Sequence, residues 1–505
     1  MLVQVIRAGT WIFLGVLFGR VLGLLRDLLL ANRLGTSSLA DTAALLLTIP
    51  DALLQLLVGG AMSAAIIPRI QSVRPSIARE LVTVFSRLLA LVSSGFTIAA
   101  ILASGILVAA FAPGLSEQAK AVACRLVPYV LCTIPLGMAT SLSTAWLQAN
   151  DKFFITSLGT VIYSSFTVAS LLLAKSELQS VEYLAVGILC GALFRFLSQA
   201  IQSPGVFSSR CFLFRYPAFD LSLLKSYLEA LACGGALFLI PVIARALATF
   251  EGSGSFALLN FAYKLVELPN GLLFSIFAIA ILPTVSRIFQ SDEKDAKAIA
   301  YILDSALVIL LMSIGACLLL ALFSHDLSRL LYFHGQMDQK SVNKIADLAQ
   351  IWFLALPFTG VSSISTVAFQ AQRNTRTPMI IGVFAFALFC IFSPAFLIYG
   401  GLQGLVSIVV LAHVVVFCLH LFWLKRCYGI DLADFLTSRY CLRAILIQLS
   451  LIVAGSLISL QFSHLTSRLV GMILTGLIAF LVALLSVPRY YRYLSNIFRA
   501  KIGTS

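Results

Sequence analysis

Residues 49–54 read IPDALL and lie in the middle of an apolar stretch that covers residues 38–66. Residues 268–273 read LPNGLL, at an offset of 219 residues, and they also lie inside an apolar stretch. Each stretch then reaches a second apolar-proline pair, Ile67-Pro68 in the first and Leu282-Pro283 in the second. This shared order predicts that the two halves of the chain repeat one fold.

A second pair of matching segments supports the repeat. The apolar stretch 121–149 ends in LQAN, and the stretch 343–371 ends in FQAQ, at an offset of 222 residues. The second and fourth apolar stretches therefore map onto the eighth and tenth, a shift of six. An even shift preserves orientation across a membrane, so the pattern predicts parallel repeats with a substrate site between them. Chance similarity between short apolar segments is the alternative.

The composition places the chain in a membrane. Hydrophobic residues make up 60% of the 505 residues and charged residues only 11%, whereas soluble proteins average about 25% charged residues. The net charge of +14 would suggest nucleic-acid binding in a soluble protein, but the basic residues here lie in short loops between apolar windows. We therefore predict no nucleic-acid partner.

The apolar windows predict an all-α polytopic membrane protein of about fourteen transmembrane helices. The predicted helices cover residues 9–31, 38–66, 86–112, 121–149, 154–175, 181–203, 223–250, 255–286, 298–323, 343–371, 377–399, 401–424, 441–461 and 468–487. We expect a six-helix lobe at 1–203, a second six-helix lobe at 204–424, and a linker, two further helices and a cytoplasmic tail at 425–505.

Lysine and arginine concentrate in the loops that follow even-numbered helices. The examples are Arg69, Arg74 and Arg79, then Arg373 and Arg376, then Lys425 and Arg426. Positive residues stay on the cytoplasmic side. Both termini are therefore predicted to be cytoplasmic, and the loop 324–342 is predicted to lie outside.

Charged residues inside the predicted helices are the candidate functional residues, because burying a charge in a membrane costs several kcal/mol. Guanidinium groups match the oxygens of phosphates. The predicted pyrophosphate-binding residues are Arg20, Arg26, Lys264 and Arg245, and the predicted gating network is Asp27, Asp41, Asp51 and Glu267. The alternative is that these charges form structural ion pairs, Arg26 with Asp27 or Asp41 and Lys264 with Glu267. Arg195 lies nearer a helix end and is predicted to reach the membrane surface.

Other chemistry is not indicated. The five histidines are scattered, and no phosphate-binding glycine loop, nucleotide motif or Ser/His/Asp set appears. We predict no catalytic residue, no metal site and no cofactor.

The run GRVLGLLRD at residues 19–27 resembles the lipid II flippase family, MurJ or MviN, of the multidrug/oligosaccharidyl-lipid/polysaccharide exporters. The resemblance continues at Ala40-Asp41-Thr42, at residues 60–68, at YKLVELPNG in 263–271, and at AQRNTRTP in 371–378. It implies two lobes around a cationic cavity, alternating access, and movement of lipid II to the outer leaflet of the bacterial inner membrane in peptidoglycan synthesis.

The resemblance also assigns residues. The family's cavity arginines fall on Arg20 and Arg26, its helix-2 aspartate on Asp41, and its helix-8 arginine and glutamate on Lys264 and Glu267. The last two helices match a pair that is thought to hold the lipid tail. Where the family usually has Arg-Arg in helix 2 this chain has Leu54-Gln55, and where it has Glu this chain has Gly59.

Three functions remain open at this point: a lipid II flippase, a flippase for another undecaprenyl-pyrophosphate-linked glycan such as an O-antigen or capsule unit, and a cation-coupled drug exporter. A non-transporting scaffold would not need arginines inside the membrane. The expected partners are the lipid-linked glycan, membrane lipids, a monovalent ion or the membrane potential as driving force, and the cell-wall synthesis machinery.

Overall fold

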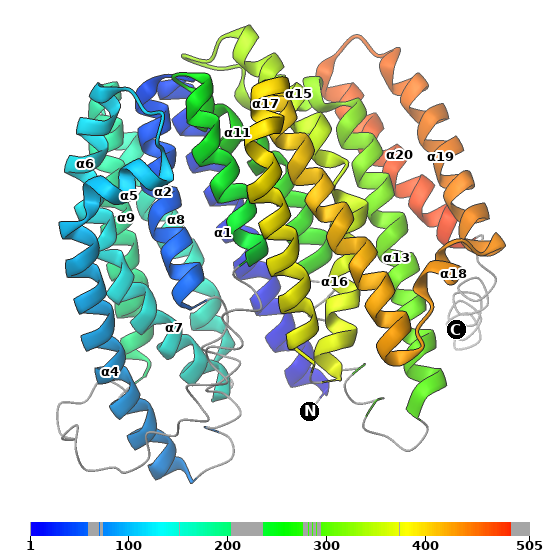
Figure 1. Cartoon of the computed structure of the whole chain (residues 1–505), viewed down its shortest axis with the longest axis horizontal. Coiled ribbons are helices and arrows are strands. Elements are labelled where there is room, and N and C mark those ends of the chain that lie inside the picture. Colours follow the sequence, from blue (N-terminus) through cyan, green and yellow to red (C-terminus); the bar gives the residue numbers. More distant parts are fainter. Residues whose placement is uncertain are drawn as a thin grey trace, which may run out of the picture. The chain divides into compact units, whose positions relative to one another are not determined.

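The structure is a computed structural model of the 505-residue chain. It describes residues 2–58, 74–150, 152–203, 236–275, 294–372 and 374–485, together with residues 70, 281, 285 and 289. Every regular element of these residues is a helix (Figure 1). Among them, nine helices are long and apolar enough to cross a membrane, or ten if one bent pair counts as a single span. The chain is therefore a multi-pass membrane protein, as its composition predicts.

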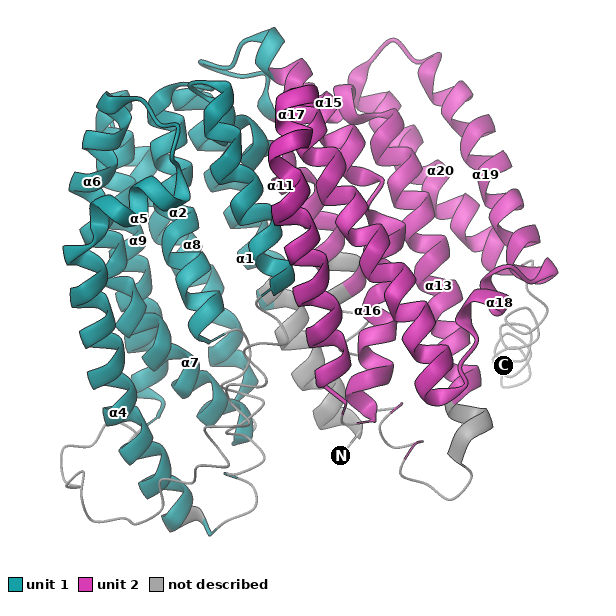
Figure 2. Cartoon of the chain, in the orientation of Figure 1, with its two compact units in different colours: residues 1–261, 332–341 teal, residues 262–331, 342–505 magenta. Residues whose placement is uncertain are grey.

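The chain divides into two compact units, and each is described by itself (Figure 2). Unit 1 comprises residues 1–261 and 332–341, and unit 2 comprises residues 262–331 and 342–505. The predicted lobe boundary at 203/204 stays a prediction, because residues 204–235 lie outside the described residues.

The most extensive helix pairs of unit 1 are α1 with α8 and α8 with α9. The first pair is parallel, since Gly15 meets Thr160 and Gly19 meets Ser164, and the second is antiparallel, since Gly159 meets Gln199 and Gly187 meets Ser170. Serine side chains cap three of the helices: Ser37, Ser116 and Ser176 each accept a hydrogen bond from a backbone N–H of the first turn. The elements are α1 (Leu2–Leu34), α2 (Ser38–Leu57), α4 (Pro75–Leu102), α5 (Ser104–Phe111), α6 (Glu117–Leu131), α7 (Thr133–Ala149), α8 (Phe153–Leu173), α9 (Glu177–Ile201), a helix at 236–248, and the 3-10 turn η1 (Thr249–Glu251).

Helix α11 (Ser255–Pro269) contributes residues to both units. The remaining elements are the π-helical turn η2 (Asn270–Ser275), α13 (Lys294–Leu322), α14 (Ser324–Tyr332), α15 (Gln339–Phe353), α16 (Leu356–Ala371), α17 (Arg376–Tyr428), α18 (Leu432–Leu436), α19 (Arg439–Leu460) and α20 (Leu465–Leu485).

Helices α19 and α20, the predicted pair outside the repeat, pack against each other and against α13. Gln448 of α19 donates a hydrogen bond from Nε2 to the Leu311 carbonyl of α13, at 2.8 Å. Apolar clusters close the rest of this contact, one of them around Phe323 and Met472. The C-terminal pair is therefore an integral part of unit 2.

Two predicted helices are broken at matching places. The predicted helix 121–149 divides into α6 and α7 at Cys132, and the predicted helix 343–371 divides into α15 and α16 at Leu354-Ala355, with a bend of 43° in the second pair. Pro135 and Pro357 follow the two breaks, and each lies in the first turn of its new helix, where proline's missing N–H costs nothing. These prolines share the 222-residue offset of the predicted repeat, so the structure adds a third match to it.

The largest shift of a helix boundary is at α4, which begins at Pro75 rather than 86, because its first turns carry Arg79 and Glu80 and are too polar for an apolar window. Predicted helices 377–399 and 401–424 both lie within α17, and the non-helical backbone at Gly401, where φ is 56°, separates them, so the predicted boundary between them is confirmed. The predicted helix 38–66 ends as α2 at Leu57, and residues 59–66 lie outside the described residues.

Residues 332–341, which we call the outer strap, belong to unit 1. The strap backbone donates from Gln336 N to the Asn32 carbonyl at 2.8 Å, and the hydroxyls of Ser341 and Thr36 lie 2.8 Å apart. Tyr332 is fully buried, and its hydroxyl donates to the Phe261 carbonyl at 3.1 Å. Hydrogen bonds from Ser341 hold the pKa of Asp338 below its usual range. One of them, from Ser341 N to Asp338 Oδ1, caps the first turn of α15. The predicted outer loop is therefore a folded element docked on the turn between α1 and α2.

Candidate functional site

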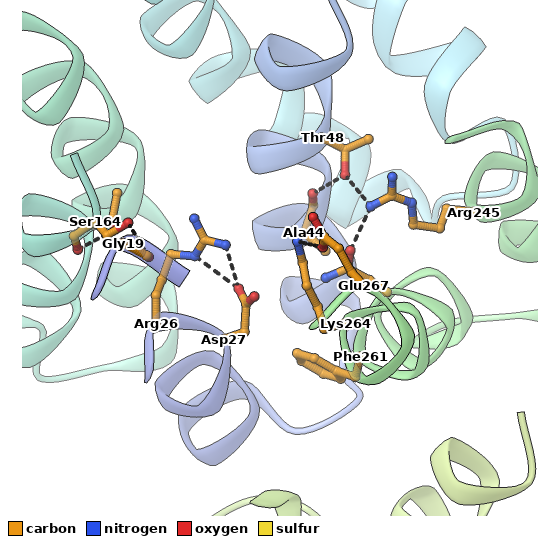
Figure 3. Close-up of polar contacts among 12 residues, drawn as sticks. Gly19, Arg26, Asp27, Ala44, Thr48, Ser164, Arg245, Phe261, Lys264 and Glu267 are labelled. Carbon is orange, nitrogen blue, oxygen red and sulfur yellow. Dashed lines mark hydrogen bonds and ion pairs between the residues drawn. The ribbon is translucent and has the colours of Figure 1, made fainter. Parts of the chain in front are cut away.

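Arg26 and Asp27 form a buried ion pair on α1. Arg26 Nε donates to Asp27 Oδ1 at 3.0 Å, a terminal nitrogen lies 2.9 Å from the same oxygen, and the side chains are 10% and 2% exposed (Figure 3). The sequence left an ion pair open as the alternative to a substrate contact, and the pair is present. A buried charge needs such a partner, so Asp27 compensates the charge of Arg26 inside the protein.

Arg20 lies on the same helix, nearly two turns before Arg26. Its neighbour Gly19 packs tightly on α8, where the Ser164 hydroxyl donates to the Gly19 carbonyl at 3.3 Å (Figure 3). Arg20 itself is intermediate in exposure. The close approach of α1 and α8 therefore fixes the rotation of the helix that carries both predicted arginines.

Arg245 is 7% exposed and is held on several sides within unit 1. Its Nε donates to the Pro241 carbonyl at 3.0 Å, and one terminal nitrogen donates to Asn260 Oδ1 at 2.8 Å and to the Thr48 hydroxyl at 3.3 Å (Figure 3). These bonds join α2, the helix 236–248 and α11. Arg245 is therefore a cross-link between three helices.

Asp41 of α2 caps the N-terminus of helix α11, although more than two hundred residues separate the two in the sequence. Its carboxylate accepts hydrogen bonds from Gly254 N at 2.6 Å and from Ala257 N at 2.8 Å, and the residue is 3% exposed. A carboxylate at this position satisfies free N–H groups and complements the helix dipole. Asp41 thus fixes the start of the helix that carries Lys264.

Lys264 and Glu267 form an ion pair on α11, within unit 2. Lys264 Nζ donates to Glu267 Oε2 at 2.7 Å, and the side chains are 24% and 41% exposed (Figure 3). Both groups remain accessible, unlike Arg245. The other predicted site residues all belong to unit 1.

Asp51 and Arg195 lie near each other in unit 1. Asp51 of α2 is exposed and lies near Arg26 of α1, Tyr163 of α8 and Arg195 of α9. Arg195 was predicted to reach the membrane surface, and this stays a prediction, because the residue keeps intermediate exposure although its Nε is buried against α8. The sequence could not reveal the packing of Nε, because helix rotation decides which way a residue near a helix end points.

Leu54 marks one of the two departures from the family pattern. Its methyl groups lie at Gly137 of α7, where an added Cβ would come within 2.6 Å of them. This position is therefore filled by apolar packing inside unit 1. Gly59, the other departure, lies outside the described residues.

Comparisons with known proteins define first a class and then a family. Among solved structures, a lipid II flippase MurJ in an inward closed conformation matches with a TM-score of 0.78 and 22% identity, covering 96% of this chain and 99% of that one. An inward-facing multidrug resistance MATE family transporter of the MOP superfamily matches with a TM-score of 0.67 and 17% identity, covering 83% and 96%. The chain has the fold of a membrane transporter of this superfamily.

Sequence comparison narrows the class. A family model described as Lipid II flippase MurJ matches residues 30–486. A probable lipid II flippase MurJ of Aquifex aeolicus (strain VF5) is 25% identical over 393 residues, 76% of each chain, and a lipid II flippase MurJ of Burkholderia cenocepacia is 24% identical over 384 residues, 73% of each. The chain belongs to the MurJ lipid II flippase family, and it is a transporter rather than an enzyme.

Proposed function

We propose that this protein moves lipid II from the inner to the outer leaflet of the bacterial cytoplasmic membrane by alternating access. The observation that carries the proposal is the family match over residues 30–486, which includes most of the helices that bear the buried charges. The same match does not favour a drug exporter or a flippase for another lipid-linked glycan.

The proposed binding residues for the pyrophosphate are Arg20, Arg26 and Lys264. Arg26 and Lys264 each already have a carboxylate partner, Asp27 and Glu267 respectively. A pyrophosphate carries more negative charge than one carboxylate and offers several oxygens to each cation. We expect the substrate to replace these carboxylates at the cations, so that the pairs return when the substrate leaves.

Arg245 and Asp41 have a different part in the proposal. Three hydrogen bonds already fix the Arg245 guanidinium, so it contributes charge to the site and positions α11. Asp41 holds the N-terminus of that helix. Arg245 stays with Arg20, Arg26 and Lys264 as a proposed pyrophosphate-binding cation, and Asp41 belongs to the proposed gating network with Asp27, Asp51 and Glu267.

The membrane orientation follows from the basic loops. We propose that both termini and the segments 69–85 and 425–440 face the cytoplasm, and that the outer strap faces outward. A monovalent ion or the membrane potential is the proposed driving force, and the cell-wall synthesis machinery is the proposed cellular partner.

Complementation tests the proposed function. The chain would be produced in a bacterium depleted of its own lipid II flippase, with survival, cell shape and the lipid II accessible at the outer leaflet as readouts. We expect growth and outer-leaflet lipid II with the natural chain, and neither with Arg26→Ala at the same protein level. A natural chain that inserts at a normal level but leaves lipid II on the inner leaflet contradicts the proposal. Arg125→Ala is the matched control, because Arg125 pairs with Glu182 on an exposed surface.

A further inference from the structure

Arg195 and Gln199 lie one turn apart on α9, and each carries a buried side-chain donor. Among the described residues, neither Arg195 Nε nor Gln199 Nε2 makes a hydrogen bond, although both atoms are buried. Both atoms lie against Gly159 of α8, where an added Cβ would be 2.9 Å from Gln199 Nε2 and 3.1 Å from Arg195 Nε. Only glycine at this position allows the two donors to come so close to α8.

Through these atoms both side chains pack against α8 inside unit 1. Gln199 is 0% exposed although it lies closer to the helix end than Arg195. Its Oε1 accepts a hydrogen bond from the Thr144 hydroxyl at 2.8 Å, which directs the amide nitrogen of the side chain to the Arg195 side. Arg195 as a whole keeps intermediate exposure, so part of the side chain remains accessible.

This arrangement favours an anion. Arginine has donors only, and the amide of Gln199 offers its donor here because its acceptor is occupied. Leaving a buried donor unpaired is costly, more so for a charged group, so the pair gains free energy from any oxyanion that reaches it. A cation or an apolar group would gain nothing from these donors.

Asp51 connects this pair to Arg26. The Asp51 carboxylate lies near both Arg195 and Arg26, and so does Tyr163. Helix α9 packs closely on α8 at this level, since a Cβ on Gly191, one turn before Arg195, would lie 2.9 Å from the Tyr163 carbonyl. A carboxylate near both arginines can compete with an anion for either of them.

The two arginines lie at different depths on the proposed topology. Arg26 is eight residues from the outer end of α1, about 12 Å at 1.5 Å per residue. Arg195 is eighteen residues from the outer end of α9, about 27 Å. Arg195 therefore belongs to the inner half of the membrane and Arg26 to the outer half.

We propose that Arg195, with Gln199 beside it, is the inner anion-binding site of this flippase. The pyrophosphate of the substrate meets Arg195 first, in competition with the nearby Asp51 carboxylate, and then moves outward to Arg26. The assignment rests on the proposed function for the identity of the substrate, but the anion site itself can be tested without transport.

Binding of inorganic pyrophosphate to the purified full-length chain, measured by calorimetry in detergent, tests the site. Arg195→Ala should weaken binding about 10-fold or more, since a hydrogen bond to a charged group contributes that much. Arg195→Lys should lose less, because it keeps the charge. Asp51→Asn should tighten binding several-fold, because it removes the competing carboxylate. Arg125→Ala should leave binding unchanged.

The outcomes separate the alternatives. A structural role alone for Arg195 would lower the thermal stability of Arg195→Ala without any tightening in Asp51→Asn. The proposal is overturned if the natural chain does not bind pyrophosphate, if Arg195→Ala binds as the natural chain does, or if Asp51→Asn weakens binding. If pyrophosphate binding depends on Arg195 but the chain does not complement the depleted strain, the result supports the anion site and contradicts the assignment of lipid II as the substrate.

Discussion

Replacing Asp41 by alanine should release the start of helix α11. The carboxylate accepts two backbone hydrogen bonds, from Gly254 and Ala257, and is almost completely buried. Hydrogen bonds to a charged acceptor are worth about 1.5–3 kcal/mol each, so losing both costs about 3 kcal/mol at the lower end. Asp41→Asn keeps an oxygen acceptor but loses the charge, and we expect about half of that cost.

Hydrogen exchange measured on a peptide that covers residues 252–260 would follow this change. At about 1.4 kcal/mol for each factor of ten, Asp41→Ala should speed amide exchange in that peptide roughly 100-fold. Asp434→Ala, an exposed aspartate of α18, should leave that peptide unchanged. Unaltered protection of residues 252–260 in Asp41→Ala would refute the role assigned to this carboxylate.

Three further predictions concern charge, topology and the outer strap. Arg26→Ala and Lys264→Ala should each abolish lipid II transport in the depleted strain, whereas Lys264→Arg should keep it because the cation remains; full complementation by both alanine variants would remove these residues from the site. A single cysteine at residue 75 should be protected from an impermeant thiol reagent added outside, in a chain without native cysteines, and labelling there would reverse the topology. Gly335→Ala should loosen the contact of the strap with α1, since Gly335 has a φ of +62° and an added Cβ would meet Asn32. Faster hydrogen exchange of the strap amides would report this change, and Gly105→Ala, on an open helix face, is the control. Unchanged exchange would show that the strap tolerates the methyl group.

The sequence predicts helices better than it predicts where they end or break. Apolar windows locate the helices because the membrane requires about twenty apolar residues for each span. The first turns of α4 were missed because Arg79 and Glu80 make them polar, although they are helical. The break at Cys132 was missed because no strong helix breaker stands at that residue, and Pro135 lies three residues further on.

The candidate site was predicted in its residue types but not in its contacts. The charges of Arg26, Lys264 and Glu267 stand out because charged residues are rare in apolar segments. The bond between Asp41 and the start of α11 could not be predicted, since it joins residues more than two hundred positions apart. The packing of Arg195 Nε against α8 could not be predicted for a related reason, because distance from a helix end says nothing about helix rotation.

The outer strap has a consequence for how the protein is made. Thr36 and Ser341, whose hydroxyls meet, are separated by 305 positions in the chain. At a synthesis rate of about 5–20 residues per second, Ser341 is synthesised roughly 15–60 s after Thr36, so the contact between them cannot form before then. The first six helices can therefore insert early, but unit 1 is not complete until the strap has been translated. A chain truncated before residue 332 would contain every membrane helix of unit 1 and would still lack a segment of its fold.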